Sequence, residues 1–175
     1  MKERADTMGN YNKSLTATVY IINEGRVLLH MHKKYNTWFP VGGHLEADEL
    51  PHEAAIREAK EESGLDITLF TPGTDTFSIG LVTRVPTPLC VYHEGDKKNG
   101  GEDFLDFIYA ATAENTFVSV SQEESGIFRW FTKKELLSEN ESIKIHIRNT
   151  ALKCLYCVTA EASEEYYPET EAAFL

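Results

Sequence analysis

The sequence predicts an α+β fold, with an α/β/α sandwich as the related alternative, from three observations. Short segments rich in β-branched residues recur along most of the chain, and helical periodicity is confined to a few stretches. The composition, 42% hydrophobic and 26% charged, is that of a globular protein with a core. The length of 175 residues favours one domain over residues 1–175, with its core at about 14–160 and an acidic tail at 161–175.

The first predicted elements form a hairpin. Residues 14–23 are rich in β-branched side chains and predict a strand, the next two residues, Glu-Gly, predict a tight turn, and residues 26–32 predict the partner strand. The run that follows at 38–43, Trp-Phe-Pro-Val-Gly-Gly, predicts a glycine-bearing loop.

A helix is predicted at about residues 51–63, because Pro51 suits a first helical turn and Gly64 suits the C-terminal cap. In the last predicted helix, apolar residues recur at helical spacing from Ile143 to Val158. The remaining elements are expected in this order: strands at 67–70, 77–85, 89–92, 104–112 and 127–131, a helix at 133–137 capped by Thr132, and the last helix at about 143–160.

The helix at 51–63 carries three carboxylates, Glu58, Glu61 and Glu62, at i, i+3 and i+4. At about 100° per residue they share one face, within an arc of about 100°. Like charges at this spacing weaken a helix unless a cation lies among them. A cluster of carboxylate oxygens suits a hard divalent ion such as Mg²⁺ or Mn²⁺, although an ordinary solvated acidic face is the alternative.

These acids belong to a longer pattern. The pattern is Gly, five residues, Glu, seven residues, Arg-Glu, an apolar residue, any residue, Glu-Glu, any residue, Gly and an apolar residue, and it resembles the signature box of the Nudix hydrolase family (MutT type). The fixed positions are occupied here by Gly43, Glu49, Arg57, Glu58, Glu61, Glu62, Gly64 and Leu65.

Three residues depart from the family pattern. Ala59 stands where a larger aliphatic residue is more common, Asp48 where Gly is frequent, and Leu50 where a capping Ser or Thr is common. None occupies a metal-binding position, so the last two concern how the chain enters the helix and leave the chemistry unaffected.

The resemblance implies a mixed central β-sheet between helices. It also implies hydrolysis of a diphosphate bond in a nucleoside diphosphate linked to another moiety, such as a nucleoside triphosphate, a nucleotide sugar or a dinucleotide. Mg²⁺ or Mn²⁺ held by carboxylates would lower the pKa of a bound water, which attacks phosphorus in line.

The resemblance also assigns roles to residues. Glu58, Glu61 and Glu62 would bind metal and act in catalysis, and the backbone carbonyl of Gly43 would be a further ligand. Arg57 and Glu49 would form a structural pair, since a bidentate guanidinium–carboxylate contact holds a loop rigidly.

Two roles stay open at this point. Glu46, on the loop before the helix, could complete the metal site or be an exposed loop residue. The general base could be Glu61 or a glutamate on the loop before the last strand, where Glu124 is favoured over Glu123 and an acidic surface loop is the alternative.

Candidate substrate-binding residues follow from residue type alone. Trp38 could stack on a nucleobase or be a core residue. Lys33 and Arg84 could contact phosphates or be solvated surface cations. Nothing in the sequence distinguishes a purine from a pyrimidine.

The charge balance limits the partners. With 17 basic and 28 acidic residues the net charge is −11, which disfavours nucleic-acid binding and therefore an mRNA-decapping role. The expected partner is a small nucleotide-type molecule, with no nucleic acid, no membrane and a possible homodimer by family habit. The N-terminal segment lacks an apolar run and the three cysteines suggest no disulfide framework, so a cytoplasmic location is expected. A binding module that has lost catalysis is the competing function, and the intact box argues against it.

Overall fold

A computed structural model of the chain describes residues 13–33, 35–71, 78–79, 81–95, 103–119, 126–138 and 142–161. Its centre is a mixed sheet of eight strands. The two longest strands, β1 (Lys13–Asn23) and β9 (Asp103–Ala113), run parallel to each other, and the other strand pairs described in this sheet are antiparallel. The other strands are β2 (Arg26–His32), β3 (Thr37–Phe39), β4 (Val41–His44), β5 (Ile67–Leu69), β8 (Cys90–Gly95) and β10 (Phe128–Thr132).

The sheet order is β10-β2-β1-β9-β5, with β3 on β2, β4 on β1 and β8 on β9. One edge of β1 is therefore shared between β2, which pairs near Ile22, and β4, which pairs with residues 16–19. Strand β4 is short, and it has no second partner among the strands that the structure describes. This arrangement matters below, because the site lies on both sides of β4.

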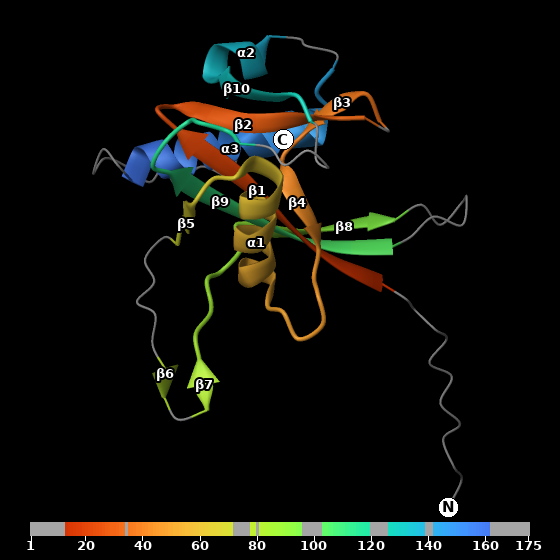
Figure 1. Cartoon of the computed structure of the whole chain (residues 1–175), viewed down its shortest axis with the longest axis vertical. Helices are drawn as coiled ribbons and strands as arrows, with labels where there is room; N and C mark the ends of the chain where they lie inside the picture. The colour runs from red at the N-terminus through yellow and green to blue at the C-terminus, as the bar shows by residue number, and fades with distance from the viewer. Residues whose placement is uncertain are drawn as a thin grey trace, which may run out of the picture.

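Helices cover both faces of the sheet, as the predicted sandwich requires (Figure 1). Helix α1 (Pro51–Ser63) packs small residues, Ala54, Ala55 and Ala59, against Ala17 and Val19 of β1 in one buried cluster. Helix α3 (Ile145–Glu161) and the short α2 (Lys133–Leu137) contribute to a second cluster on the opposite face.

The side-chain alternation of β1 and β9 separates the two faces. Odd-numbered residues such as Val19 and Tyr109 face α1, and even-numbered residues such as Tyr20 and Ile108 face α3. The predicted apolar row of the last helix is confirmed, because Ile147, with others of that row, is buried in the second cluster.

Two segments differ from the sequence prediction. The expected loop at 38–43 instead forms β3 and β4, separated by Pro40, since the extended backbone pairs with β2 and β1. The expected strand at 77–85 is a hairpin of β6 (Ser78–Ile79) and β7 (Val82–Thr83) set apart from the main sheet (Figure 1). Its Phe77 lies outside the described residues.

Helix α1 has the predicted bounds, and Gly64 ends it at φ 72°, a left-handed conformation that glycine adopts without strain. The two departures from the family pattern lie at its entry. Asp48 is left-handed at φ 65°, where a glycine would be relaxed. Leu50 has no side-chain acceptor for the first-turn N–H groups, and the Glu53 carboxylate supplies the other half of a capping box by accepting the Leu50 N–H at 2.9 Å.

Helix α2 begins at Lys133, as predicted. Thr132 caps it, because its hydroxyl accepts the N–H of Glu135. Helix α3 begins two residues later than predicted, at Ile145. None of the helices in the described parts of the chain is both long and apolar enough to span a bilayer.

Candidate active site

Arg57 organises the acidic face of α1. Its Nε and Nη2 atoms donate to the two carboxylate oxygens of Glu49 at 2.8 and 2.9 Å, which is the bidentate geometry. Its Nη1 atom donates to Glu58 at 2.8 Å and to Glu61 at 2.9 Å. A further bond, to the carbonyl of His44 at 3.0 Å, ties the helix to the end of β4. One guanidinium therefore holds the loop, the strand and two of the three acids.

The electrostatics follow from these contacts. Hydrogen bonds from Arg57 lower the pKa of Glu49, and the same bonds raise the pKa of Arg57. Glu58 and Glu61 are neighbours across one nitrogen, which relieves the repulsion expected at i, i+3 spacing. The Glu58 side chain is only 14% exposed, whereas that of Glu61 is 58% exposed.

The two glycines of β4 make room for the other contacts of the acids. A Cβ on Gly43 would lie 2.2 Å from Oε1 of Glu58, so this carboxylate occupies the space of a missing side chain. The next residue back, Gly42, donates its N–H to Oε2 of Glu62 at 3.3 Å. Glu58 and Glu62 thus lie against successive residues of one strand.

The donor set suits a hard cation, because all three side chains offer carboxylate oxygens and Gly43 lets Glu58 approach the backbone of β4. In the described part of the chain, no three His, Cys, Asp or Glu side chains converge on one point as they stand. Arg57 is the cation that Glu58 and Glu61 share. A divalent ion would compete with Arg57 for these oxygens.

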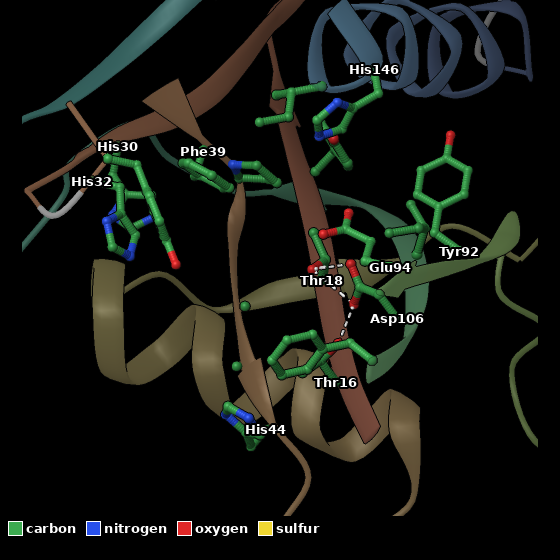
Figure 2. A pocket seen from close by; sticks show the side chains of 18 of the residues that line it. Thr16, Thr18, His30, His32, Phe39, His44, Tyr92, Glu94, Asp106 and His146 are labelled. Carbon is green, nitrogen blue, oxygen red and sulfur yellow. Dashed lines mark hydrogen bonds between the residues drawn. The ribbon is translucent and has the colours of Figure 1, made fainter. Parts of the chain in front are cut away.

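A cavity of about 290 Å³ lies on the other face of the sheet and reaches one of these acids, Glu62. Figure 2 shows the cavity from close by. Gly42, Gly43 and Glu62 line it, although α1 packs on the opposite face. Glu62 therefore links the acidic helix to the cavity past β4. His146 and Ile147, at the start of α3, close the far end of the cavity.

Three polar residues form the floor of this cavity. Thr16 and Thr18 on β1 donate their hydroxyls to Oδ1 of Asp106 on β9, each at 3.0 Å, and Thr18 is also 2.9 Å from Oδ2 (Figure 2). Burial raises the pKa of the Asp106 carboxyl, and the nearby charge of Glu94 raises it further, while the two hydroxyls act in the opposite direction. These residues continue the face of Tyr20 and Ile108 beyond the cover of α3.

The walls of the cavity are rich in flat rings. His32 lies 4.7 Å from Tyr35 and 5.3 Å from Phe39, measured between ring centroids. Lys144 places its ammonium 5.3 Å from the ring of Tyr35 and 5.2 Å from that of Phe39. His30, next to His32 in the wall, has its pKa lowered by burial.

The structure does not bring every predicted substrate residue to the cavity. Trp38 is 8% exposed and packs edge-on against Phe131 at 4.9 Å, so it takes the core position that the sequence left as the alternative. It belongs to the second buried cluster and does not line the cavity. Lys33 and Arg84 are exposed, and neither lines the cavity.

The two remaining predicted residues also lie elsewhere. Glu46 is exposed and lines a shallow hollow with Glu49 and Arg57, on the loop side of the helix. Glu124 and its neighbour Glu123 fall outside the described residues.

Comparison with known proteins decides the family. A family model described as the NUDIX domain matches residues 12–150. The chain belongs to the NUDIX family. Its members are hydrolases of nucleoside diphosphate derivatives and generally use divalent metals.

Solved structures of NUDIX proteins share the fold. A NUDIX-family hydrolase from Clostridium perfringens is similar at 34% identity and a TM-score of 0.72, over 84% of this chain and 99% of that one. A MutT NUDIX hydrolase from Burkholderia pseudomallei is similar at 24% identity and a TM-score of 0.56, over 81% and 96%. A UDP-X diphosphatase matches at 15% identity and a TM-score of 0.58, over 90% and 68%, which shows the fold alone.

Sequence reasoning missed the floor of the cavity. Thr16, Thr18 and Asp106 lie within segments that were correctly predicted as strands, where polar residues are expected to face water. The available signal was their register, because Thr16 pairs with Asp106 on parallel strands. That pairing cannot be derived from either segment alone.

Proposed function

We propose that this NUDIX protein is an active, Mg²⁺-dependent hydrolase that cleaves the diphosphate bond of a nucleotide whose base lies in the cavity. The observation that carries this proposal is the position of Glu62. Its carboxylate accepts the N–H of Gly42 and lines the cavity, while the neighbouring acids of α1 lie on the other side of β4. A diphosphate at the edge of β4 would reach both.

The proposed roles of the residues are those that the family resemblance implies. Glu58, Glu61 and Glu62, with the carbonyl of Gly43, would hold the ion. Arg57 and Glu49 would keep the loop and helix in register, since their contact joins them bidentately. The cavity would bind and orient the rest of the substrate and keep its reacting end at β4.

Mg²⁺, when bound, supplies neutralisation of phosphate charge and a water of lowered pKa. In this proposal, Glu61 is a candidate for the general base because it is the one exposed acid of the trio, and its carboxylate can turn toward solvent. Glu124 remains the other candidate, and the homodimer remains a prediction.

The test is hydrolysis of a nucleotide panel that contains nucleoside triphosphates, nucleotide sugars and dinucleotides, with Mg²⁺, Mn²⁺ or EDTA. We expect phosphate or nucleoside monophosphate release that EDTA abolishes. Glu62→Gln should lower kcat/KM by about 100-fold or more, because the amide keeps the shape and loses the charge.

The matched control is Glu114→Gln, the same chemical change at an exposed glutamate just after β9. It should retain wild-type kinetics. Equal turnover by the wild type and Glu62→Gln, or turnover that survives EDTA, would contradict the proposed mechanism. A wild type that binds nucleotides but cleaves none would favour the binding-module alternative.

A further inference from the structure

The floor of the cavity interrupts the apolar face of β1 and β9 with polar residues. Along the even-numbered face of β1 and β9, apolar residues such as Tyr20 and Ile108 pack under α3. The same face then changes to Thr16, Thr18 and Asp106, where α3 stops. A polar floor at the end of an apolar face is what a cavity needs to orient a ligand.

Asp106 has hydrogen-bond donors around it but no cationic partner in the described part of the chain. Both threonine hydroxyls point to it, and no salt bridge to Asp106 occurs among the residues that the structure describes. An ionised carboxylate has about four lone-pair positions and no donor. Two hydroxyl protons leave acceptor capacity, and Asp106 lines the cavity, so that capacity is directed to whatever the cavity holds.

The neighbouring groups strengthen the preference for donors. Glu94 of β8 lines the same part of the cavity and is a second acceptor (Figure 2). A ligand edge that presents carbonyl oxygens here would face the lone pairs of two carboxyl groups. A ligand edge that presents an amino group would find acceptors for its protons.

The shape of the site indicates which part of the substrate meets this floor. The walls carry the flat rings of Tyr35, Phe39 and Phe104, which suit a planar heterocycle. The phosphate end must lie at Gly42 and Glu62 if the proposed function holds. The base is then the part of the nucleotide left for the floor.

Resting on the proposed function, we propose that Asp106 is the specificity-determining residue, and that it selects nucleotides whose base carries an exocyclic amino group. Adenine and cytosine carry one, and their oxo counterparts hypoxanthine and uracil present a carbonyl oxygen at the same position. Thr16 and Thr18 act as positioning residues, because both hydroxyls donate to Oδ1 and the Thr18 hydroxyl also lies 2.9 Å from Oδ2, which fixes the plane of the carboxylate.

Asp106→Asn tests this without removing the network. The amide oxygen can accept from both threonines in the position of Oδ1. The NH₂ group then takes the position of Oδ2, where one proton can go to the Thr18 hydroxyl 2.9 Å away and the other is available to the cavity. The substitution therefore converts an acceptor into a donor at the same place. It should disfavour the amino base and favour the oxo base.

The experiment is calorimetric titration of the full chain with two matched pairs of products, AMP against IMP and CMP against UMP. The wild type should bind the amino member of each pair about 10- to 100-fold more tightly, the range expected for a hydrogen bond to a charged group. Asp106→Asn should abolish or reverse that preference. Asp106→Ala should abolish it without reversal, because it supplies neither donor nor acceptor.

The matched control is Asp103→Asn, the same change on the same strand. Asp103 contacts His93 at 3.7 Å and does not line the cavity, so the wild-type preference should persist. No preference in the wild type, a preference for the oxo member, or an equal change of all four affinities in Asp106→Asn would overturn the inference. So would the absence of any binding.

The two proposals can fail separately. A wild type that discriminates AMP from IMP but cleaves no nucleotide would overturn the proposed function and leave the role of Asp106 standing. A wild type that cleaves adenine and hypoxanthine nucleotides equally, with equal product affinities, would do the reverse.

Discussion

The ionised carboxylate of Asp106 lowers the free energy of unfolding of the protein. Its pKa is raised in the folded chain by burial and by Glu94, which means that folding disfavours the ionised carboxylate. Well above the raised pKa the carboxyl is ionised in both the folded and the unfolded state, and the full cost applies. As the pH falls through the raised pKa to the ordinary value of 3.8, the cost disappears.

Asp106→Asn should therefore stabilise the protein at neutral pH. We expect a Tm higher than that of the wild type at pH 7.5, because the amide carries no charge to bury. The difference should shrink as the pH approaches 3.8, where the wild-type carboxyl is protonated. Differential scanning calorimetry of both proteins at the two pH values measures this, and a constant difference would contradict it.

At the same scale, the sequence predicted the acidic trio better than its surroundings. The shared helical face of Glu58 and Glu61 follows from spacing alone, because the geometry of a helix is regular. That one nitrogen of Arg57 bonds both of them could not be derived in this way, because it depends on rotamers set by Glu49 and by the end of β4. For Trp38 the sequence left two roles open, because an aromatic residue suits a core and a stacking site equally, and the structure places it in the core against Phe131.

Strand β4 lies between the acids of α1 and the cavity. Its two glycines would meet different neighbours if they carried a side chain. A Cβ on Gly42 would lie 2.5 Å from the carbonyl oxygen of Ala17 and 2.8 Å from Cα of Thr18, which are backbone atoms that cannot easily move. A Cβ on Gly43 would meet the end of the flexible Glu58 side chain. Gly42 is therefore needed for the packing of β4 against β1, and Gly43 is needed for the position of the Glu58 carboxylate.

Two alanine variants should separate these effects. Gly42→Ala should lower the Tm by about 3–10 °C, in line with about 1–3 kcal/mol for overpacking. Gly43→Ala should leave the Tm within about 2 °C of the wild type but reduce kcat/KM by about 10- to 100-fold, because it displaces Glu58. Thermal melts and steady-state kinetics of both variants are the measurement. Wild-type kinetics in Gly43→Ala would show that the position of Glu58 is unimportant.

The same strand shows where element prediction fails. The Gly-Gly pair was interpreted as a loop because glycine usually marks one. In the structure the pair lies in a strand because its missing side chains allow close approach to β1 on one side and to α1 on the other. By contrast, α1 was predicted with its correct bounds, since Pro51 and Gly64 mark its ends locally. Local signals were sufficient for this helix, and long-range pairing was needed for the strand.

For the whole molecule, the net charge of −11 opposes compaction, and a divalent cation should relieve part of it at α1. Ligands that bind only the folded state raise its stability. We expect Mg²⁺ at about 100 times its Kd to raise the Tm by about 5–10 °C, equivalent to about 2.7 kcal/mol.

Scanning fluorimetry with MgCl₂ measures this shift, and NaCl at matched ionic strength controls for general screening. Glu58→Gln combined with Glu62→Gln should remove the Mg²⁺-specific part and keep the salt response. An identical shift in the wild type and the double variant would show that the ion binds elsewhere.

The overall architecture was accessible from the sequence because the alternation and the signature box both specify it. The mixed sheet between two helical layers was implied by the resemblance and is confirmed. The position of the cavity could not be predicted from the sequence. It lies where the first turn of α3 meets β1 and β9, and that boundary depends on how three separate segments pack.

Under the proposed function, the four-residue strand β4 separates the metal-binding acids of α1 from the base-binding cavity, and Glu62 is the acid of α1 that lines the cavity. Mutations of residues that line the cavity need not disturb Glu58 and Glu61 on the other side of β4. Under the proposed function, substitution of a few cavity residues can therefore change the nucleotide preference while the acids of α1 stay the same.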